Sequence, residues 1–203
     1  MLNKFLSGVS AGLLISLGGT VFLACENRVV GSVFFCVALL CICYKGYSLY
    51  TGRVGYMLRD ASKDYFSALF LGLLGNIAGT AAGGAAIRLA LPSLIEKAQA
   101  VCNPKLGQTP LQTLLRALFC GILMYLAVSI FAQHKTPVSI LWCVPAFILS
   151  GFEHCVADMF YFAVCGLPTW RVIAFLALAV LGNSIGAWIL PLLNKKEREK
   201  NVQ

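Results

Sequence analysis

The chain has 203 residues, of which 59% are hydrophobic and 12% charged, and its formal net charge is +8. Soluble domains carry about a quarter charged residues, so this composition, with a mean hydropathy of +0.82, excludes a soluble domain and predicts an integral membrane protein. We interpret the positive charge as a signal of membrane topology rather than of nucleic-acid binding.

Six windows are long and apolar enough to cross a bilayer as helices. They cover roughly residues 5–25, 30–50, 65–91, 110–133, 138–165 and 170–193. None alternates apolar and polar residues, which argues against a β-barrel. The first window lacks a signal-peptide cleavage pattern, so we interpret it as a helix. We therefore expect an all-α protein with a single transmembrane domain over residues 1–203 and no separate soluble domain.

The second window ends in a cluster of turn-forming residues. Gly46, Ser48, Thr51 and Gly52 follow one another closely at its end. Glycine and small polar residues gathered after an apolar run stop a helix. The sequence therefore predicts a broken element over residues 46–53.

Two prolines, Pro104 and Pro110, lie between the third and fourth windows. They favour an ordered turn or a helix start over a flexible linker. Lys105 has two interpretations here: an ordinary lysine of the outer face, or a cation that serves a site. Arg116, near the outer end of the fourth window, is expected to snorkel or to cap neighbouring carbonyls.

The fifth window carries the most informative residues. Between positions 138 and 165, the side chains that do not suit lipid are Glu153, His154 and Asp158. Such groups at membrane depth usually face an interior path. The preceding Gly151 predicts a helix break. His154 and Asp158, four residues apart, share one helical face, and Glu153 points about 100° away.

The chain also contains an internal repeat. Leu74-Gly-Asn-Ile-Ala-Gly79 and Leu181-Gly-Asn-Ser-Ile-Gly186 agree at four positions, which include Asn76 and Asn183. Each string falls in the third helix of its half, after a broken second helix. Three spans per repeat force the two repeats to be inverted, with a site where the broken helices meet. We assign repeat one to about 1–92, repeat two to about 105–193, and a basic tail to 194–203.

The six spans place both termini on one side of the membrane. The tail from Asn194 to Lys200, the segment from Arg53 to Lys63, and Lys135 fall on that side. The positive-inside rule makes this side cytoplasmic, in the cell inner (plasma) membrane.

Cysteine and histidine usage argues against an enzyme or a metal centre. Most of the nine cysteines lie inside spans, where we interpret them as small buried residues. Cys102 and Cys165 are the pair nearest the outer face, and the sequence does not say whether they meet. With only His134 and His154 and no catalytic triad pattern, we expect no enzyme activity, no metal and no cofactor.

Residues 151–160, Gly-Phe-Glu-His-Cys-Val-Ala-Asp-Met-Phe, resemble the GFEHxxANM signature of the formate/nitrite transporter family. Leu49-Tyr-Thr-Gly52 is similar to the family's LFTG loop, and the two LGNxxG strings resemble its third and sixth helices. Lys105, with the later stretches 116–120 and 126–128, resembles the family's lysine ahead of its RGILCNxLVxLAV helix. The resemblance covers nearly the whole chain.

The resemblance implies an aquaporin-like protomer with broken second and fifth helices, assembled as a homopentamer. Each protomer would hold its own pore for small monovalent anions such as formate, nitrite or hydrosulfide. The residue roles that the resemblance implies are a central pair of Thr51 and His154, a constriction at Phe35 and Leu39, gates at Tyr50 and Phe147, and an electropositive vestibule residue at Lys105.

Three positions depart from the family pattern. Tyr50 stands where Phe is usual, and Gly121 and Asp158 stand where the family has Asn. A carboxylate at 158 adds negative charge beside an anion path. Three interpretations are open: Asp158 faces away and caps a helix, it is kept protonated, or the pore prefers something other than the usual anions. We favour a structural hydrogen-bonding role.

The resulting hypothesis is a proton-coupled anion pore. Lys105 attracts the anion, and desolvation favours protonation of the weak acid, which passes the constriction as a neutral molecule. His154 either lends the proton or acts as a neutral donor, and Glu153 is expected to anchor the broken helix through backbone N–H groups. The alternatives are an aquaporin-like channel for small neutral solutes and a purely structural membrane subunit.

Overall fold

The computed structural model describes residues 1–194, and the chain is helical throughout this range apart from short connections. The helices are α1 (Leu2–Ala24), α2 (Arg28–Lys45), α3 (Tyr50–Arg53), the 3₁₀ helix η1 (Val54–Leu58), α4 (Lys63–Ala90), α5 (Leu94–Leu106), α6 (Pro110–His134), α7 (Val138–Ser150), α8 (Cys155–Cys165) and α9 (Trp170–Leu193). The predicted basic tail, apart from Asn194, lies outside the described residues.

The predicted spans are confirmed within a few residues at each end. In residues 1–194, α1, α2, α4, α6 and α9 are each long and apolar enough to cross a membrane. The sixth span is the pair α7 and α8, whose axes bend by 55° at the break between them. The protein is therefore a multi-pass membrane protein.

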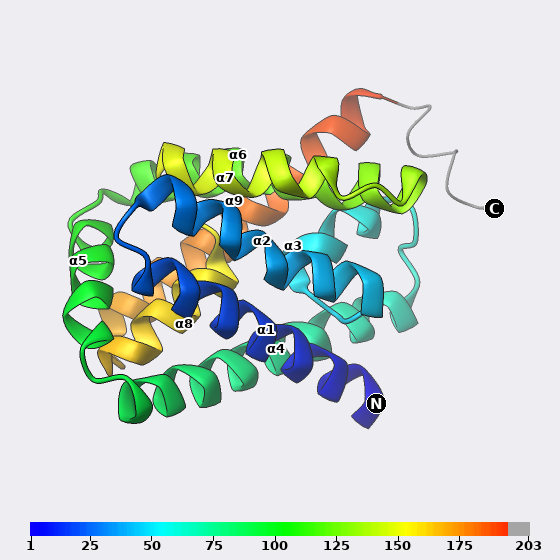
Figure 1. The fold of residues 1–203 in the computed structure, drawn as a ribbon. Coiled ribbons are helices and arrows are strands. Elements are labelled where there is room, and N and C mark those ends of the chain that lie inside the picture. The colour runs from blue at the N-terminus through cyan, green and yellow to red at the C-terminus, as the bar shows by residue number, and fades with distance from the viewer. Residues whose placement is uncertain (195–203) are drawn as a thin grey trace.

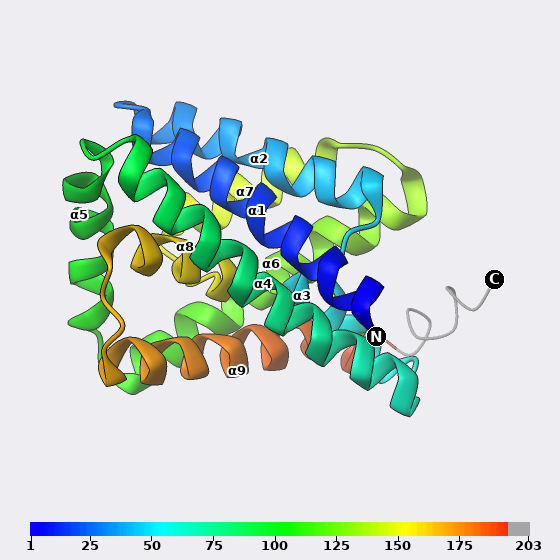
Figure 2. The ribbon, with the colours of Figure 1, turned by 90° about the horizontal axis from the view of Figure 1, so that it is seen from below.

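Helix α5 connects the two halves and lies across one end of the bundle (Figures 1 and 2). Of the two prolines that favoured an ordered turn or a helix start, Pro110 does begin α6, whereas Pro104 lies near the end of the complete helix α5. The N-terminus lies at the opposite end of the bundle in both views. This arrangement places α5 over one mouth of the molecule.

Both broken spans stop at a glycine in the left-handed conformation. Gly46 has φ of 69° and Gly151 has φ of 71°, values that glycine adopts without the steric penalty of a side chain. After each glycine, the next backbone N–H bonds back to a carbonyl of the last turn: Tyr47 to Ile42 and Phe152 to Phe147. This is the Schellman pattern, which closes a helix and redirects the chain.

The first and third helices of each half pack closely through glycine. A Cβ atom on Gly12 of α1 would lie 2.6 Å from the Asn76 carbonyl oxygen of α4. In the second half, a Cβ on Gly182 of α9 would lie 2.6 Å from the Leu114 carbonyl oxygen of α6. Small residues at these contacts let helix backbones approach, which drives association in lipid.

The two asparagines of the repeated string hold the two breaks in the same way. The Asn76 amide donates to the Gly8 and Ser48 carbonyls at 2.9 and 2.8 Å, and its oxygen accepts from Tyr50 N–H at 2.9 Å. The Asn183 amide donates to the Ala117 and Glu153 carbonyls at 2.8 Å, and its oxygen accepts from Cys155 N–H at 2.9 Å. The predicted pair of three-helix repeats is confirmed, and these bonds match residue 48 with 153 and 50 with 155.

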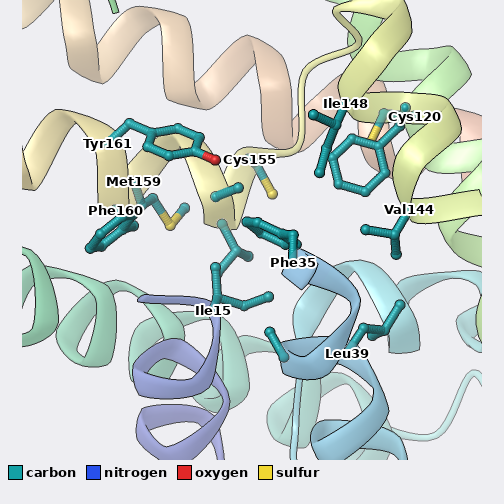
Figure 3. Close-up of a cluster of buried hydrophobic side chains, with 14 of the residues drawn as sticks. Ile15, Phe35, Leu39, Cys120, Val144, Ile148, Cys155, Met159, Phe160 and Tyr161 are labelled. Carbon is teal, nitrogen blue, oxygen red and sulfur yellow. The ribbon is translucent and has the colours of Figure 1, made fainter. Parts of the chain in front are cut away.

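The main apolar core surrounds α8 and includes buried residues of α1, α2, α5, α6, α7 and α9. Figure 3 shows Phe35 of α2 between Cys155 of α8 and Leu39 of its own helix. Phe35 and Leu39 are each 2% exposed. The core therefore surrounds the point at which α8 begins.

Candidate functional site

The break before α8 fixes the orientation of His154. His154 is the N-cap of α8, and its Nδ1 accepts a hydrogen bond from Ala157 N–H at 3.1 Å. The other ring nitrogen, Nε2, lies 2.8 Å from Thr51 Oγ1 in the opposite broken span. Both side chains are buried, so residues 103 positions apart in the chain meet at the junction of the two halves.

These contacts also determine where the imidazole carries its proton. An N–H donor already points at Nδ1, so Nδ1 is the acceptor nitrogen and the proton of the neutral ring is on Nε2. The Nε2–H therefore donates to the Thr51 hydroxyl oxygen. The Thr51 hydroxyl keeps its own O–H to donate.

Aromatic rings surround this polar pair on one side. The Phe147 ring stacks on His154, with centroids 5.4 Å apart and planes at 20°. Phe35 meets Phe147 edge to face, with centroids 6.3 Å apart. The arrangement puts two hydrogen-bonding groups in an apolar constriction.

Of the four residues predicted to form a constriction, Tyr50 is placed differently from the other three. Its hydroxyl lies 2.8 Å from Ser184 Oγ of α9. Tyr50 and Thr51 are successive residues of the short helix α3, so their side chains point about 100° apart. Thr51 contacts His154 and Tyr50 contacts Ser184, two different elements of the second repeat.

A cavity of about 450 Å³, here called the α5 vestibule, lies between α5 and the break at Gly151. Its lining includes His154 and Phe147 at the inner end. The charged residues in its lining are the cations Arg28, Lys105 and Arg116 and the carboxylates Glu153 and Asp158. The cations outnumber the carboxylates by one, so the vestibule is electropositive.

A second cavity of about 450 Å³, here called the η1 vestibule, lies at the other end of α2. Leu39, Leu49 and Gly52 line its inner part. The charged residues in its lining are Arg53, Arg59, Asp60 and Lys135. The His154–Thr51 pair and the aromatic rings therefore lie between two vestibules of about 450 Å³ each, one toward each membrane face.

Lys105 lies inside the α5 vestibule, held by two carboxylates. Its ammonium bonds to Glu153 Oε2 and lies 2.9 Å from Asp158 Oδ1. Burial alone lowers the pKa of Lys105, but the charges of Asp158 and Glu153 outweigh it and raise the pKa. Lys105 is therefore a charged residue of the site, with 13% of its side chain exposed.

Glu153 differs from the expectation that it anchors the helix break through backbone N–H groups. Gln108 Nε2 donates to Glu153 Oε1 at 2.6 Å, and Lys105 takes the other oxygen. Thr113 in turn donates to Gln108 Oε1 at 3.0 Å. The amide of Asn183 anchors the break instead, which frees the Glu153 side chain to face α5.

Asp158 shares the helical turn that His154 caps, as expected, but its partner is on another helix. Its Oδ1 pairs with Lys105, and its Oδ2 is buried without a hydrogen-bond partner among the described residues. The sequence gave no indication of this pairing, because Lys105 and Asp158 lie in different helices and neither their spacing nor the internal repeat relates the two positions.

Four further side chains lie at this end of the molecule. Arg28 donates to the Ile148 carbonyl at 2.8 Å and so caps the last turn of α7, a role that sequence reasoning missed. Arg116 is exposed at the vestibule. Cys102 of α5 and Cys165 of α8 do meet, with their sulfur atoms 3.4 Å apart.

Comparisons with known proteins agree with this architecture. The family model described as formate/nitrite transporter matches residues 1–194. A solved structure titled "Pentameric formate channel with formate bound" superposes with a TM-score of 0.79 at 22% identity, covering 95% of this chain and 94% of the other. A second, titled "FNT family ion channel", superposes with a TM-score of 0.76 at 23% identity, covering 93% of this chain and 85% of the other. No curated protein sequence matches the chain.

Proposed function

Because the chain belongs to the formate/nitrite transporter family, we propose that it carries small monovalent anions of weak acids, such as formate, nitrite or hydrosulfide, across the membrane. The observation that carries the proposal is the pair of vestibules separated by the His154–Thr51 contact. A path with water at both ends and a narrow dry centre suits a small solute that is selected at its midpoint.

The α5 vestibule is the site of anion capture. Arg28, Lys105 and Arg116 attract the anion there, against the opposing charges of Glu153 and Asp158. Clefts lined by one sign of charge raise the local concentration of the opposite ion. Lys105 attracts the anion while it is paired with Glu153 and Asp158, and Arg28 and Arg116 add positive charge around it.

The constriction at Phe35, Leu39 and Phe147 is a barrier to a bare anion. Moving an unpaired carboxylate into an apolar medium costs far more than a fast pore can sustain, and the group takes up a proton instead. The weak acid therefore crosses this region as a neutral molecule. Transport is coupled to protons, and flux follows the pH gradient.

His154 and Thr51 are the midpoint hydrogen-bonding pair. The neutral acid needs a donor and an acceptor in the constriction, and the Nε2–H and the Thr51 hydroxyl supply both. Protonating the ring at Nδ1 requires loss of the Ala157 cap bond. His154 therefore acts as a neutral donor and is not the source of the proton.

The remaining parts of the proposal concern assembly and orientation. The protein works as a homopentamer in the cell inner (plasma) membrane, which agrees with the pentameric title of one structural neighbour. Both termini face the cytoplasm, so α5 faces outward. Support comes from the sequence of the tail, where Lys195, Lys196, Arg198 and Lys200 add positive charge to the side of the N-terminus.

Uptake of labelled formate into proteoliposomes under an imposed pH gradient tests the proposal. We expect formate flux that rises with inward proton gradient, that falls about tenfold or more in His154→Ala, and that also falls in Lys105→Ala. Lys97→Ala, an exposed lysine on the same helix, is the matched control and should retain flux. Unchanged flux in both site variants contradicts the assignment, and water flux without anion flux identifies a neutral-solute channel instead.

A further inference from the structure

The carboxylates of the Lys105 network outnumber its single cation. One ammonium bonds to Glu153 and to Asp158, and both carboxyl side chains are at most 2% exposed. Two ionised carboxylates on one lysine leave an uncompensated negative charge in a buried place. Such a charge also offsets part of the positive charge of Arg28 and Arg116, which attracts an anion into the same vestibule.

The hydrogen bonds show which of the two carboxyl groups is incompletely satisfied. Both oxygens of Glu153 are bonded, one to Lys105 and one to Gln108, as an ionised carboxylate requires. Asp158 has one oxygen on Lys105, and its Oδ2 is buried without a partner among the described residues. Buried polar atoms without partners are rare in folded proteins. Oδ2 is therefore the position at which a proton removes the excess charge.

We propose that Asp158 holds a proton on Oδ2 and gives it to a small carboxylate anion, such as formate, that enters the α5 vestibule. This inference rests on the proposed transport of weak-acid anions and adds the source of the proton. Asp158 lines the vestibule, as does His154 at its inner end, so the donor is in place before the constriction is reached.

The proton transfer balances without any other reactant. The O–H bond at Asp158 Oδ2 breaks, its electron pair stays on the Asp158 carboxylate, and a new O–H bond forms on a formate oxygen. Burial disfavours the ionised form of any carboxyl group, so a formate that has lost its hydration beside Asp158 takes the proton at little cost in free energy. Hydronium from the outer solution then restores the proton on Asp158.

The transfer also couples each anion to one proton. After it, Lys105 again faces two carboxylates, and the added negative charge weakens the attraction of the vestibule for the next anion until Asp158 regains its proton. The released formic acid is neutral and passes the constriction. His154 cannot serve in the same way, because its Nδ1 is occupied by the Ala157 N–H and its Nε2 donates to Thr51.

The surroundings of Asp158 contain few other groups that can titrate. Those that interact with it or border it are Cys102 and Lys105 from α5, Cys120 from α6, Glu153 and His154 from the break, and Cys155 and Tyr161 from α8. The buried residues of α1, α4 and α9, which also pack on α8, include no ionisable side chain. Lys105 and Glu153 are thus the charges that act most strongly on Asp158, and Arg28 of α2 and Arg116 of α6 are the other charges in the vestibule that it lines.

Infrared spectroscopy of the reconstituted full chain tests whether Asp158 carries the proton. The chain has three aspartates, and the other two, Asp60 and Asp64, are exposed. With isotope-labelled aspartate carboxyls, we expect a protonated carboxyl stretch at neutral pH in the wild type, retained in Asp64→Asn and absent in Asp158→Asn. The labelled wild type alone is decisive: carboxylate bands without a protonated band at neutral pH overturn the proposal.

Formate flux supplies the second readout. We expect wild-type uptake to rise as the outer pH falls, and Asp158→Asn to lose this rise and about tenfold of the rate. A general acid accelerates a proton-transfer reaction by about 100-fold or more. The expected loss is smaller than this because water can donate the proton in the variant, at a lower rate. Asp64→Asn should keep both the rate and the pH profile.

The two readouts separate this inference from the proposed function. Wild-type formate transport with an unchanged Asp158→Asn rate and pH profile overturns the proton donor and leaves the function intact. A protonated Asp158 band in a protein that carries none of formate, nitrite and hydrosulfide overturns the proton transfer and the proposed function together. Retained transport with a flattened pH profile in Asp158→Asn supports both.

Discussion

The two helix breaks have the same backbone and opposite chemistry. Gly46 and Gly151 adopt the same left-handed conformation, and an asparagine from the third helix of each repeat clamps each break. At the position where the second break has His154, the first has Leu49, which is 2% exposed. The repeat therefore supplies a symmetric frame, and the functional groups are concentrated in one half of it.

The charges at the two breaks differ in the same way. Matching residue 48 with 153 pairs Arg53 with Asp158, a cation with a carboxylate. Arg53 donates to the Gly46 carbonyl at 3.0 Å on an exposed surface. Asp158 is buried against Lys105 of α5, the helix that joins the first repeat to the second. The connection between the repeats thus makes the two mouths chemically different.

The largest expected effect comes from removing the cation that exists at only one break. Lys105→Gln leaves the buried Glu153 carboxylate without its ion pair, and breaking such a pair lowers the free energy of unfolding by about 4 kcal/mol. Arg53→Gln, at the other break, should change it by less than about 1 kcal/mol. Denaturant unfolding in detergent micelles measures both. Equal losses for the two variants contradict the asymmetry.

The two asparagines that hold the breaks, Asn76 and Asn183, test the symmetric part of the comparison. Asn76→Ala and Asn183→Ala each remove three buried hydrogen bonds, and at about 1 kcal/mol per bond each should lower the free energy of unfolding by about 3 kcal/mol. The same unfolding measurement applies. If only one of the two variants has a lower free energy of unfolding, the two asparagines do not stabilise their repeats equally.

The smallest expected effect concerns the two glycines. Alanine at Gly46 or Gly151 meets no atom within 4 Å, so only the positive φ opposes it, at about 1 kcal/mol for each. Gly107, with φ of −85°, is the matched control, and its replacement by alanine should not destabilise the protein. Thermal unfolding of the three variants ranks them. If alanine at Gly107 destabilises the protein as much as alanine at Gly151, the positive φ of Gly151 does not explain the loss of stability.

Much of this arrangement could be predicted from local patterns in the sequence. Apolar length predicted the six spans, Gly46 and Gly151 predicted the breaks, and the two LGNxxG strings predicted the repeats. These features depend on local rules: a helix in lipid satisfies its own backbone, and a left-handed turn requires glycine. The contact of Thr51 with His154 was expected only through a family resemblance, since the residues themselves gave no reason for it.

The partners of Lys105 could not be predicted in this way. Its ammonium reaches Glu153 and Asp158 because α5 folds across the mouth of the second repeat, and no spacing in the sequence reports that docking. The same holds for the meeting of Cys102 with Cys165 and for the turn of Tyr50 toward Ser184. Each joins elements whose relative positions follow from packing over the whole bundle.

By itself, the sequence determined which segments cross the membrane, where two of them break, and that one half repeats the other, because hydrophobic length and glycine conformation act within a few residues. Only the tertiary structure decided which charges face one another. Electrostatic partners are selected by distance in space, and Lys105 and Glu153 are 48 positions apart in the chain yet in contact in the folded protein.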